Sequence, residues 1–184
     1  MIEPEVRVIT WNYKTILYMV GLGLVLLVLQ TTIELWAGPS GHGPEFLVVM
    51  VVFLGLKAPL ARGAILSAGF GFFRDATSGG IFGMSAAIFF VIFLATHRAR
   101  QRLDPTAPYY LALFIFLSAL VVGGLSVLML HMFGWAPQSV SFSYYGPAAN
   151  LIKSSLLTML IGLPLFWTCK WLASQPEERP EQET

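Results

Sequence analysis

The residues of this chain that could do chemistry do not form a complete catalytic or metal-binding set. An aspartyl site needs two carboxylates that share a proton, but the chain has only two aspartates, and Asp104 lies on a basic loop far from Asp75. A nucleophilic Ser85 would need a histidine base on a neighbouring helix. The histidines are scattered, without a carboxylate or cysteine at ligand spacing: His42, His97 and His131. We therefore expect no catalysis, no metal and no cofactor.

Asp75 is the acidic residue whose setting needs an explanation. A charged side chain at the centre of a membrane helix costs about 2.5–3.5 kcal/mol and is a functional candidate by default. Asp75 instead precedes a glycine-rich turn, where aspartate commonly bonds backbone N–H groups. We favour this structural role over chemistry. Arg74 and Lys153 are its candidate charge partners, and a Lys153 that snorkels alone is the alternative.

The segment before Asp75 has a face of small residues when it is read as a helix. The candidate packing or partner face comprises Gly63, Ala64, Ser67, Ala68 and Gly71. In lipid, small residues at such spacing let two helix backbones approach closely. We expect this helix to be central and well covered. A second small face in the fifth apolar run is expected to pair with it, and it comprises Ser118, Gly123, Gly124 and Ser126.

Composition places the chain in a membrane. Of its 184 residues, 56% are hydrophobic and only 11% are charged, which is too little polar surface for a soluble globule. The net charge of +1 provides no basic field for nucleic acid. The single cysteine, Cys169, excludes an internal disulfide, and we expect a buried, inert thiol.

Six apolar runs predict an all-α integral membrane protein with six transmembrane helices. We expect one domain over 1–172, with helices at about 15–35, 44–58, 60–75, 81–97, 109–132 and 150–172, and a disordered cytoplasmic tail at 173–184. The apolar parts of the second and third helices are short, about 16 Å each against a hydrocarbon core of about 30 Å. They form either a compact spanning hairpin or a re-entrant pair.

Charge asymmetry predicts the orientation. Arg98, Arg100 and Arg102 form a basic loop that we place in the cytoplasm, and most other Lys and Arg residues fall on the same side. Both termini are then cytoplasmic. The loops 36–45 and 133–147 contain no Lys or Arg and are expected outside, with interfacial aromatic residues Trp36, Trp135, Tyr144 and Tyr145.

The central segment resembles a known family. Pro44-Glu-Phe46, Gly69-Phe-Gly71 and the turn Asp75-Ala-Thr-Ser-Gly79-Gly80-Ile-Phe-Gly83 resemble the rod shape-determining protein MreD family. Relatives of that type usually read Pro-Asp where this chain has Pro44-Glu45, and Gly-x-Pro-Leu-Gly at the end of the turn. The resemblance implies a fold similar to the substrate-binding subunits of energy-coupling-factor transporters. It marks Gly69, Gly71, Asp75, Gly79, Gly80 and Gly83 as family-motif residues.

The resemblance also implies a function. It points to a non-enzymatic scaffold subunit of the bacterial cell-elongation machinery in the inner membrane. MreC is the implied direct partner, with MreB, RodA and a class B penicillin-binding protein in the same assembly, which builds peptidoglycan. The alternative is a vitamin-binding transporter subunit with a site near Trp135, Tyr144, Tyr145 and Asn150. Such a site needs several converging polar groups, and the outer third of the chain offers few besides Asn150, Lys153 and Asp75.

Overall fold

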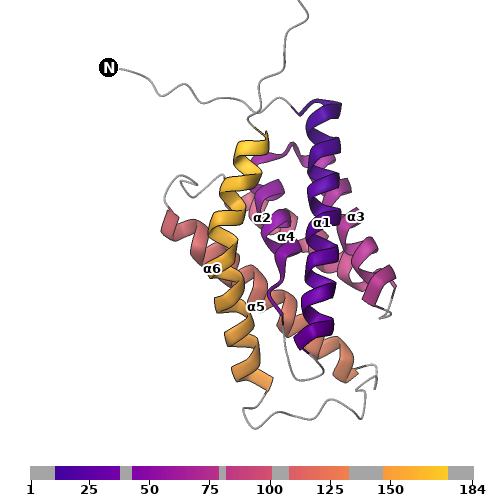
Figure 1. Cartoon of the computed structure of the whole chain (residues 1–184), viewed down its shortest axis with the longest axis vertical. Helices are drawn as coiled ribbons and strands as arrows, with labels where there is room; N and C mark the ends of the chain where they lie inside the picture. The colour runs from indigo at the N-terminus through magenta and orange to yellow at the C-terminus, as the bar shows by residue number, and fades with distance from the viewer. Residues whose placement is uncertain (1–10, 38–42, 79–81, 101–107, 133–146, 174–184) are drawn as a thin grey trace, which may run out of the picture.

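The computed structural model describes residues 11–37, 43–78, 82–100, 108–132 and 147–173, and all regular structure in these ranges is helical. The helices are α1 (Tyr13–Ala37), α2 (Phe46–Lys57), α3 (Leu60–Ser78), α4 (Met84–Ala99), α5 (Pro108–Met132) and α6 (Pro147–Ala173) (Figure 1). Within these described ranges, two segments are long and apolar enough to cross a membrane, Tyr13–Ile33 and Leu151–Leu172. The predicted tail lies outside the described residues beyond Ala173.

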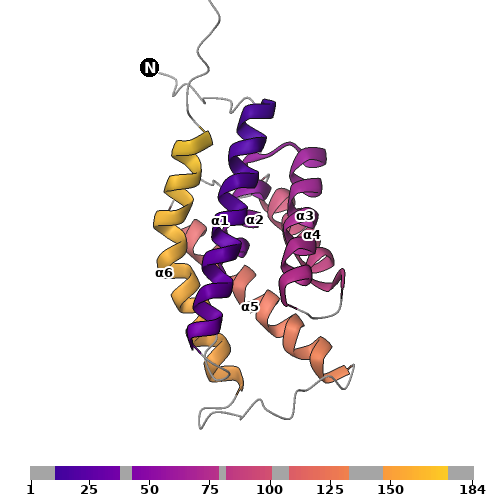
Figure 2. The same cartoon turned by 45° about the vertical axis from the view of Figure 1, so that its right-hand side comes forward.

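Helix α2 is the centre of the bundle. Every residue from Phe46 to Leu56 is buried, and α2 contacts each of the other five helices. Figures 1 and 2 show it enclosed behind α1 and α6, which run side by side. A helix that is apolar on all sides has no polar face to present to solvent, so it is buried among the other helices.

The prediction that the third helix is the central one was therefore wrong. Helix α3 lies at the edge of the bundle and exposes large apolar side chains, with Ile65 73% and Phe73 52% exposed. Its glycines Gly63 and Gly71 lie against α4, and among the described residues α3 packs more extensively against α4 than against α1 or α2. A face of small residues therefore indicated close packing of one pair of helices and not a central position.

Glycines of α3 and α2 bring their backbones against α4. A Cβ atom built on Gly71 would lie 2.5 Å from the backbone nitrogen of Ala86 and 2.6 Å from the carbonyl carbon of Ser85. A Cβ on Gly55 of α2 would lie 2.6 Å from Cβ of Thr96. Neither position has room for a side chain. The helix pairs of this bundle are thus held by close backbone approach, as expected where lipid removes the hydrophobic drive for association.

Helix α5 packs differently from the prediction. It contacts α6, α2 and α4, but it makes no contact with α3 among the described residues. Gly123 lies against the side chain of Leu151 on α6. The expected pairing of the fifth and third helices was wrong, because the central α2 and the neighbouring α4 separate them.

Apolar side chains fill the core of the bundle and also cover much of its outer surface. Large apolar side chains cover the outside of α1, α5 and α6; Leu17, Leu117, Leu160 and Trp171 are each more than half exposed. Polar side chains are buried inside: Gln30, Ser67, Asp75, Thr96, Ser118, Ser155 and Thr158. An exterior with so many exposed large apolar side chains is suited to hydrocarbon and not to water.

Candidate functional site

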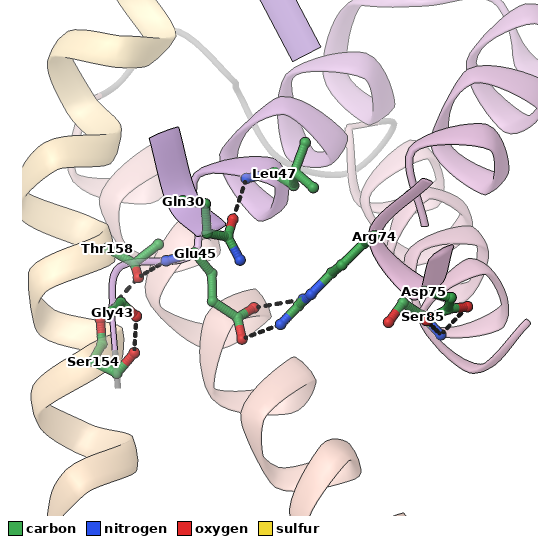
Figure 3. Close-up of polar contacts among 9 residues, drawn as sticks. All are labelled: Gln30, Gly43, Glu45, Leu47, Arg74, Asp75, Ser85, Ser154 and Thr158. Carbon is green, nitrogen blue, oxygen red and sulfur yellow. Dashed lines mark hydrogen bonds and ion pairs between the residues drawn. The ribbon is translucent and has the colours of Figure 1, made fainter. Parts of the chain in front are cut away.

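Asp75 links α3 to the start of α4. The side chain is 4% exposed, and Oδ2 accepts a hydrogen bond from the backbone N–H of Gly83 at 2.8 Å. Both carboxylate oxygens also accept the N–H of Ser85 at 3.1 Å, a contact shown in Figure 3. These N–H groups belong to the first turn of α4 and have no partner within that helix. A carboxylate at this point also interacts favourably with the positive end of the helix dipole.

The geometry of the turn explains Gly83. This residue is the N-cap of α4 and has φ of 91°, in the left-handed region that side chains disfavour. Helix α3 continues to Ser78, so Asp75 lies one turn inside the helix and not at its end as predicted. From there it reaches across to α4. Gly79 and Gly80 lie outside the described residues.

Arg74 pairs with a different carboxylate from the one predicted. Its Nη2 lies 3.2 Å from Oε1 of Glu45, and its Nη1 donates to Oε2 at 3.5 Å (Figure 3). The guanidinium also lies 5.7 Å from the centre of the Phe89 ring. Adjacent residues on a helix point in different directions. Arg74 therefore reaches Glu45 at the N-cap of α2 and the Phe89 ring of α4, while Asp75 reaches the first turn of α4.

Lys153 is also placed away from Asp75. It is exposed on α6, and α6 makes no contact with α3 in the described part of the chain. The predicted tie between the third and sixth helices is therefore not formed there. The snorkelling of Lys153, the alternative interpretation, stays a prediction.

Polar side chains of α1, α3 and α6 converge on Glu45, the N-cap residue of α2. We call Gln30, Glu45, Arg74, Ser154 and Thr158 the α2-start cluster. Thr158 Oγ1 accepts the backbone N–H of Glu45 at 3.0 Å, and Ser154 Oγ donates to the carbonyl of Gly43 at 3.0 Å. Gln30 Oε1 accepts the N–H of Leu47 at 3.5 Å. Figure 3 shows the cluster in one view.

The α2-start cluster solves a physical problem of the short central helix. The first N–H groups of any helix lack internal partners, and inside a membrane protein they cannot turn to bulk water. Side chains of α1 and α6 accept two of them, and the carboxylate of Glu45 lies at the positive end of the α2 dipole. The cluster can therefore stabilise the buried N-terminus of α2. Its two opposite charges, on Glu45 and Arg74, neutralise each other.

The opposite end of α2 is stabilised by cationic and aromatic donors. Arg100 Nη1 donates to the carbonyls of Ala58 at 3.1 Å and Leu56 at 3.4 Å. The indole of Trp11 donates to the carbonyl of Lys57 at 3.0 Å, and Arg62 donates to the carbonyl of Trp11. The last carbonyls of a helix are as short of partners as its first N–H groups. Arg100 is thus a cap of α2 as well as a member of the predicted basic loop.

The remaining predicted residues occupy several environments. Ser67 is fully buried, and within the described residues its hydroxyl has no hydrogen-bond partner. Gly69 has open space around it, whereas Gly63 lies against the side chain of Phe93. Arg98 is exposed. Arg102, Trp135, Tyr144 and Tyr145 lie outside the described residues, as does the side chain of Asn150.

Sequence reasoning missed the Glu45–Arg74 pair and the role of Gln30. The available signal was a lone amide and a lone acid beside apolar runs, which need partners when buried.

The described residues contain no group of three or more His, Cys, Asp or Glu that could hold a metal ion. Cys169 is buried.

An apolar exterior, buried polar side chains that bond to helix ends, and helices joined through glycine contacts define a helical membrane protein. The family described as rod shape-determining protein MreD matches residues 10–172, and the chain therefore belongs to that family. The predicted resemblance is confirmed. It is a family of membrane proteins with a structural role in rod shape. Comparison with curated proteins and with solved structures gives no match.

Proposed function

We propose that this protein is a non-enzymatic scaffold subunit of the bacterial cell-elongation complex, which binds MreC in the inner membrane. Through MreC it would join MreB, RodA and a class B penicillin-binding protein during peptidoglycan synthesis. The observation that carries the proposal is the family match across residues 10–172, since this family determines rod shape. The proposal includes six membrane crossings with both termini in the cytoplasm.

The internal packing supports a scaffold over a ligand carrier. The polar groups of the α2-start cluster form hydrogen bonds and an ion pair with one another and with helix ends. These contacts engage the polar groups that a small ligand would need for its own binding. Asp75 is likewise engaged by two backbone N–H groups. An interior whose polar groups are engaged in this way leaves the outer faces of α1, α3, α5 and α6 as the surfaces on which lipid and a partner helix can lie.

The partner is tested by affinity purification of the full chain in mild detergent. We expect MreC in the eluate at a constant ratio to this protein. Recovery of a bound vitamin with a coupling subunit, and no MreC, would instead support the energy-coupling-factor transporter alternative. A matched control is the Gly71→Leu variant, whose α3–α4 contact cannot form; MreC recovery should fall with it if the folded bundle is what MreC recognises.

The six-crossing topology is tested by cysteine accessibility in a Cys169→Ser background. Single cysteines at Lys14, Pro59 and Lys170 should react with a membrane-impermeant thiol reagent only after the inner membrane is opened. A cysteine at Trp36 should react in intact spheroplasts, because this residue is 93% exposed at the far end of α1. Equal labelling of Trp36 and Lys170 positions would contradict the proposed orientation.

A further inference from the structure

One end of the bundle holds a concentration of positive charge that the scaffold role does not use. The starts of α1 and α3 and the ends of α2, α4 and α6 meet there, and Figures 1 and 2 place the start of α1 beside the end of α6. Lys57 lies within electrostatic range of Lys170 and Arg100. We call this set the basic end; it comprises Lys14, Lys57, Arg62, Arg98, Arg100 and Lys170.

No acidic side chain of the described residues compensates this charge. The acids whose side chains are described are Glu45 at the start of α2 and Asp75 near the end of α3, both towards the opposite end. The ion pair between Glu45 and Arg74 also lies at that opposite end, away from the basic end. Among the described residues, folding therefore brings six cations together without a counter-charge, and such a concentration of charge attracts anions.

The position of Lys57 and Lys170 suggests where an anion would lie. Lys57 is the last residue of α2 and is half-buried, while Lys170 is exposed near the end of the neighbouring α6. Arg100 donates hydrogen bonds to the carbonyls of Leu56 and Ala58. These bonds keep the Arg100 charge close to the two lysines. The two lysines provide rotatable donors suited to the compact charge of a phosphate.

The residues around Lys170 are suited to binding a lipid and not a soluble anion. Trp167 and Trp171 are 71% and 64% exposed, and exposed tryptophans next to a lysine are typical of the headgroup level of a bilayer. Leu160, two turns before Trp167, is 68% exposed and continues the apolar surface along α6. A bound molecule could thus place a phosphate at the lysines and an acyl chain along the same helix.

We propose that the basic end is a binding site for an anionic phospholipid, with the headgroup phosphate between Lys57 and Lys170 and an acyl chain along Trp167 and Leu160. The inference rests on the membrane placement in the proposed function, but it does not depend on MreC. In the proposed orientation the lipid belongs to the cytoplasmic leaflet.

The test uses quenching of tryptophan fluorescence by brominated lipids in vesicles that contain the full chain. Trp167 and Trp171 should be quenched more efficiently by brominated phosphatidylglycerol than by brominated phosphatidylcholine at equal mole fraction. One basic side chain near an anionic surface contributes about 1 kcal/mol, so Lys170→Gln should reduce the phosphatidylglycerol preference about fivefold. The Lys57→Gln/Lys170→Gln variant should reduce it about 25-fold by the same reasoning.

Lys153→Gln is the matched control, because it removes an exposed lysine from the opposite end of the same helix. Its lipid preference should equal that of the unmodified protein. Equal effects of Lys153→Gln and Lys170→Gln, or no preference for phosphatidylglycerol, would overturn the proposal. So would displacement of the lipid by millimolar inorganic phosphate, which would indicate a site for free anions.

Deleting residues 174–184 distinguishes a lipid from the acidic tail as the occupant of the basic end. If phosphatidylglycerol preference arises only in the shortened chain, the tail is the occupant and the lipid proposal is wrong. Recovery of MreC is measured in parallel with the double lysine variant. Loss of lipid preference with MreC retained is the expected result, whereas absence of MreC from the unmodified protein would refute the scaffold function and leave the lipid result to stand by itself.

Discussion

Replacing Gly71 with alanine should destabilise the bundle through a single methyl group. The new Cβ atom would lie 2.5 Å from the backbone nitrogen of Ala86, roughly 1 Å inside ordinary van der Waals contact. Backbone atoms cannot turn away as the end of a side chain can, so α3 and α4 must separate. Forced overpacking of this kind typically costs about 1–3 kcal/mol, against about 1 kcal/mol gained because alanine favours helix over glycine.

Gly69→Ala is the control that isolates the contact. It adds the same methyl group two residues away on the same helix, where nothing lies within 4 Å of the new Cβ. It should gain up to about 1 kcal/mol from helix propensity alone. Of the two single-methyl variants, the one at Gly71 should thus be the less stable by about 1–3 kcal/mol, the overpacking term.

Thermal unfolding in detergent, followed by circular dichroism, measures this difference. For a chain of this size about 1 kcal/mol corresponds to roughly 2–4 °C in Tm, so Gly71→Ala should melt roughly 2–12 °C below Gly69→Ala. Equal melting temperatures for the two variants would show that α3 and α4 are not packed backbone to backbone. A fall in Tm for Gly69→Ala would show that the open face of α3 is covered by another chain.

Three further changes probe the polar contacts. Asp75→Ala should lower the free energy of unfolding by about 1–3 kcal/mol, because two partly buried N–H groups lose their acceptor, and Asp75→Asn should lower it less because one acceptor oxygen remains. Glu45→Gln and Arg74→Gln should each cost up to about 3–5 kcal/mol, and the double variant should cost less than their sum; an additive double variant in urea titrations would refute the ion pair. Arg100→Met should lower Tm more than Arg98→Met, since only Arg100 caps α2; equal shifts would contradict that cap.

The candidate site was predictable from the sequence only in its local part. Asp75 and Gly83 are eight residues apart, and an aspartate before a glycine-rich turn predicts bonds to nearby backbone N–H groups, which the structure contains. Glu45 and Arg74 are 29 residues apart, and the sequence contains no signal for which acid Arg74 meets. The same limit applied to Arg100, which reaches carbonyls more than 40 residues away.

The sequence by itself determined the membrane character of this protein, its helical elements and the Asp75 turn, because hydropathy, helix periodicity and turn chemistry act over a few residues. Only the tertiary structure decided that α2 is the central helix, that the small face of α3 lies on α4, and that Arg74 pairs with Glu45. Those outcomes depend on how whole helices exclude one another in space. A helix that is apolar all round can be placed only once all its neighbours are present.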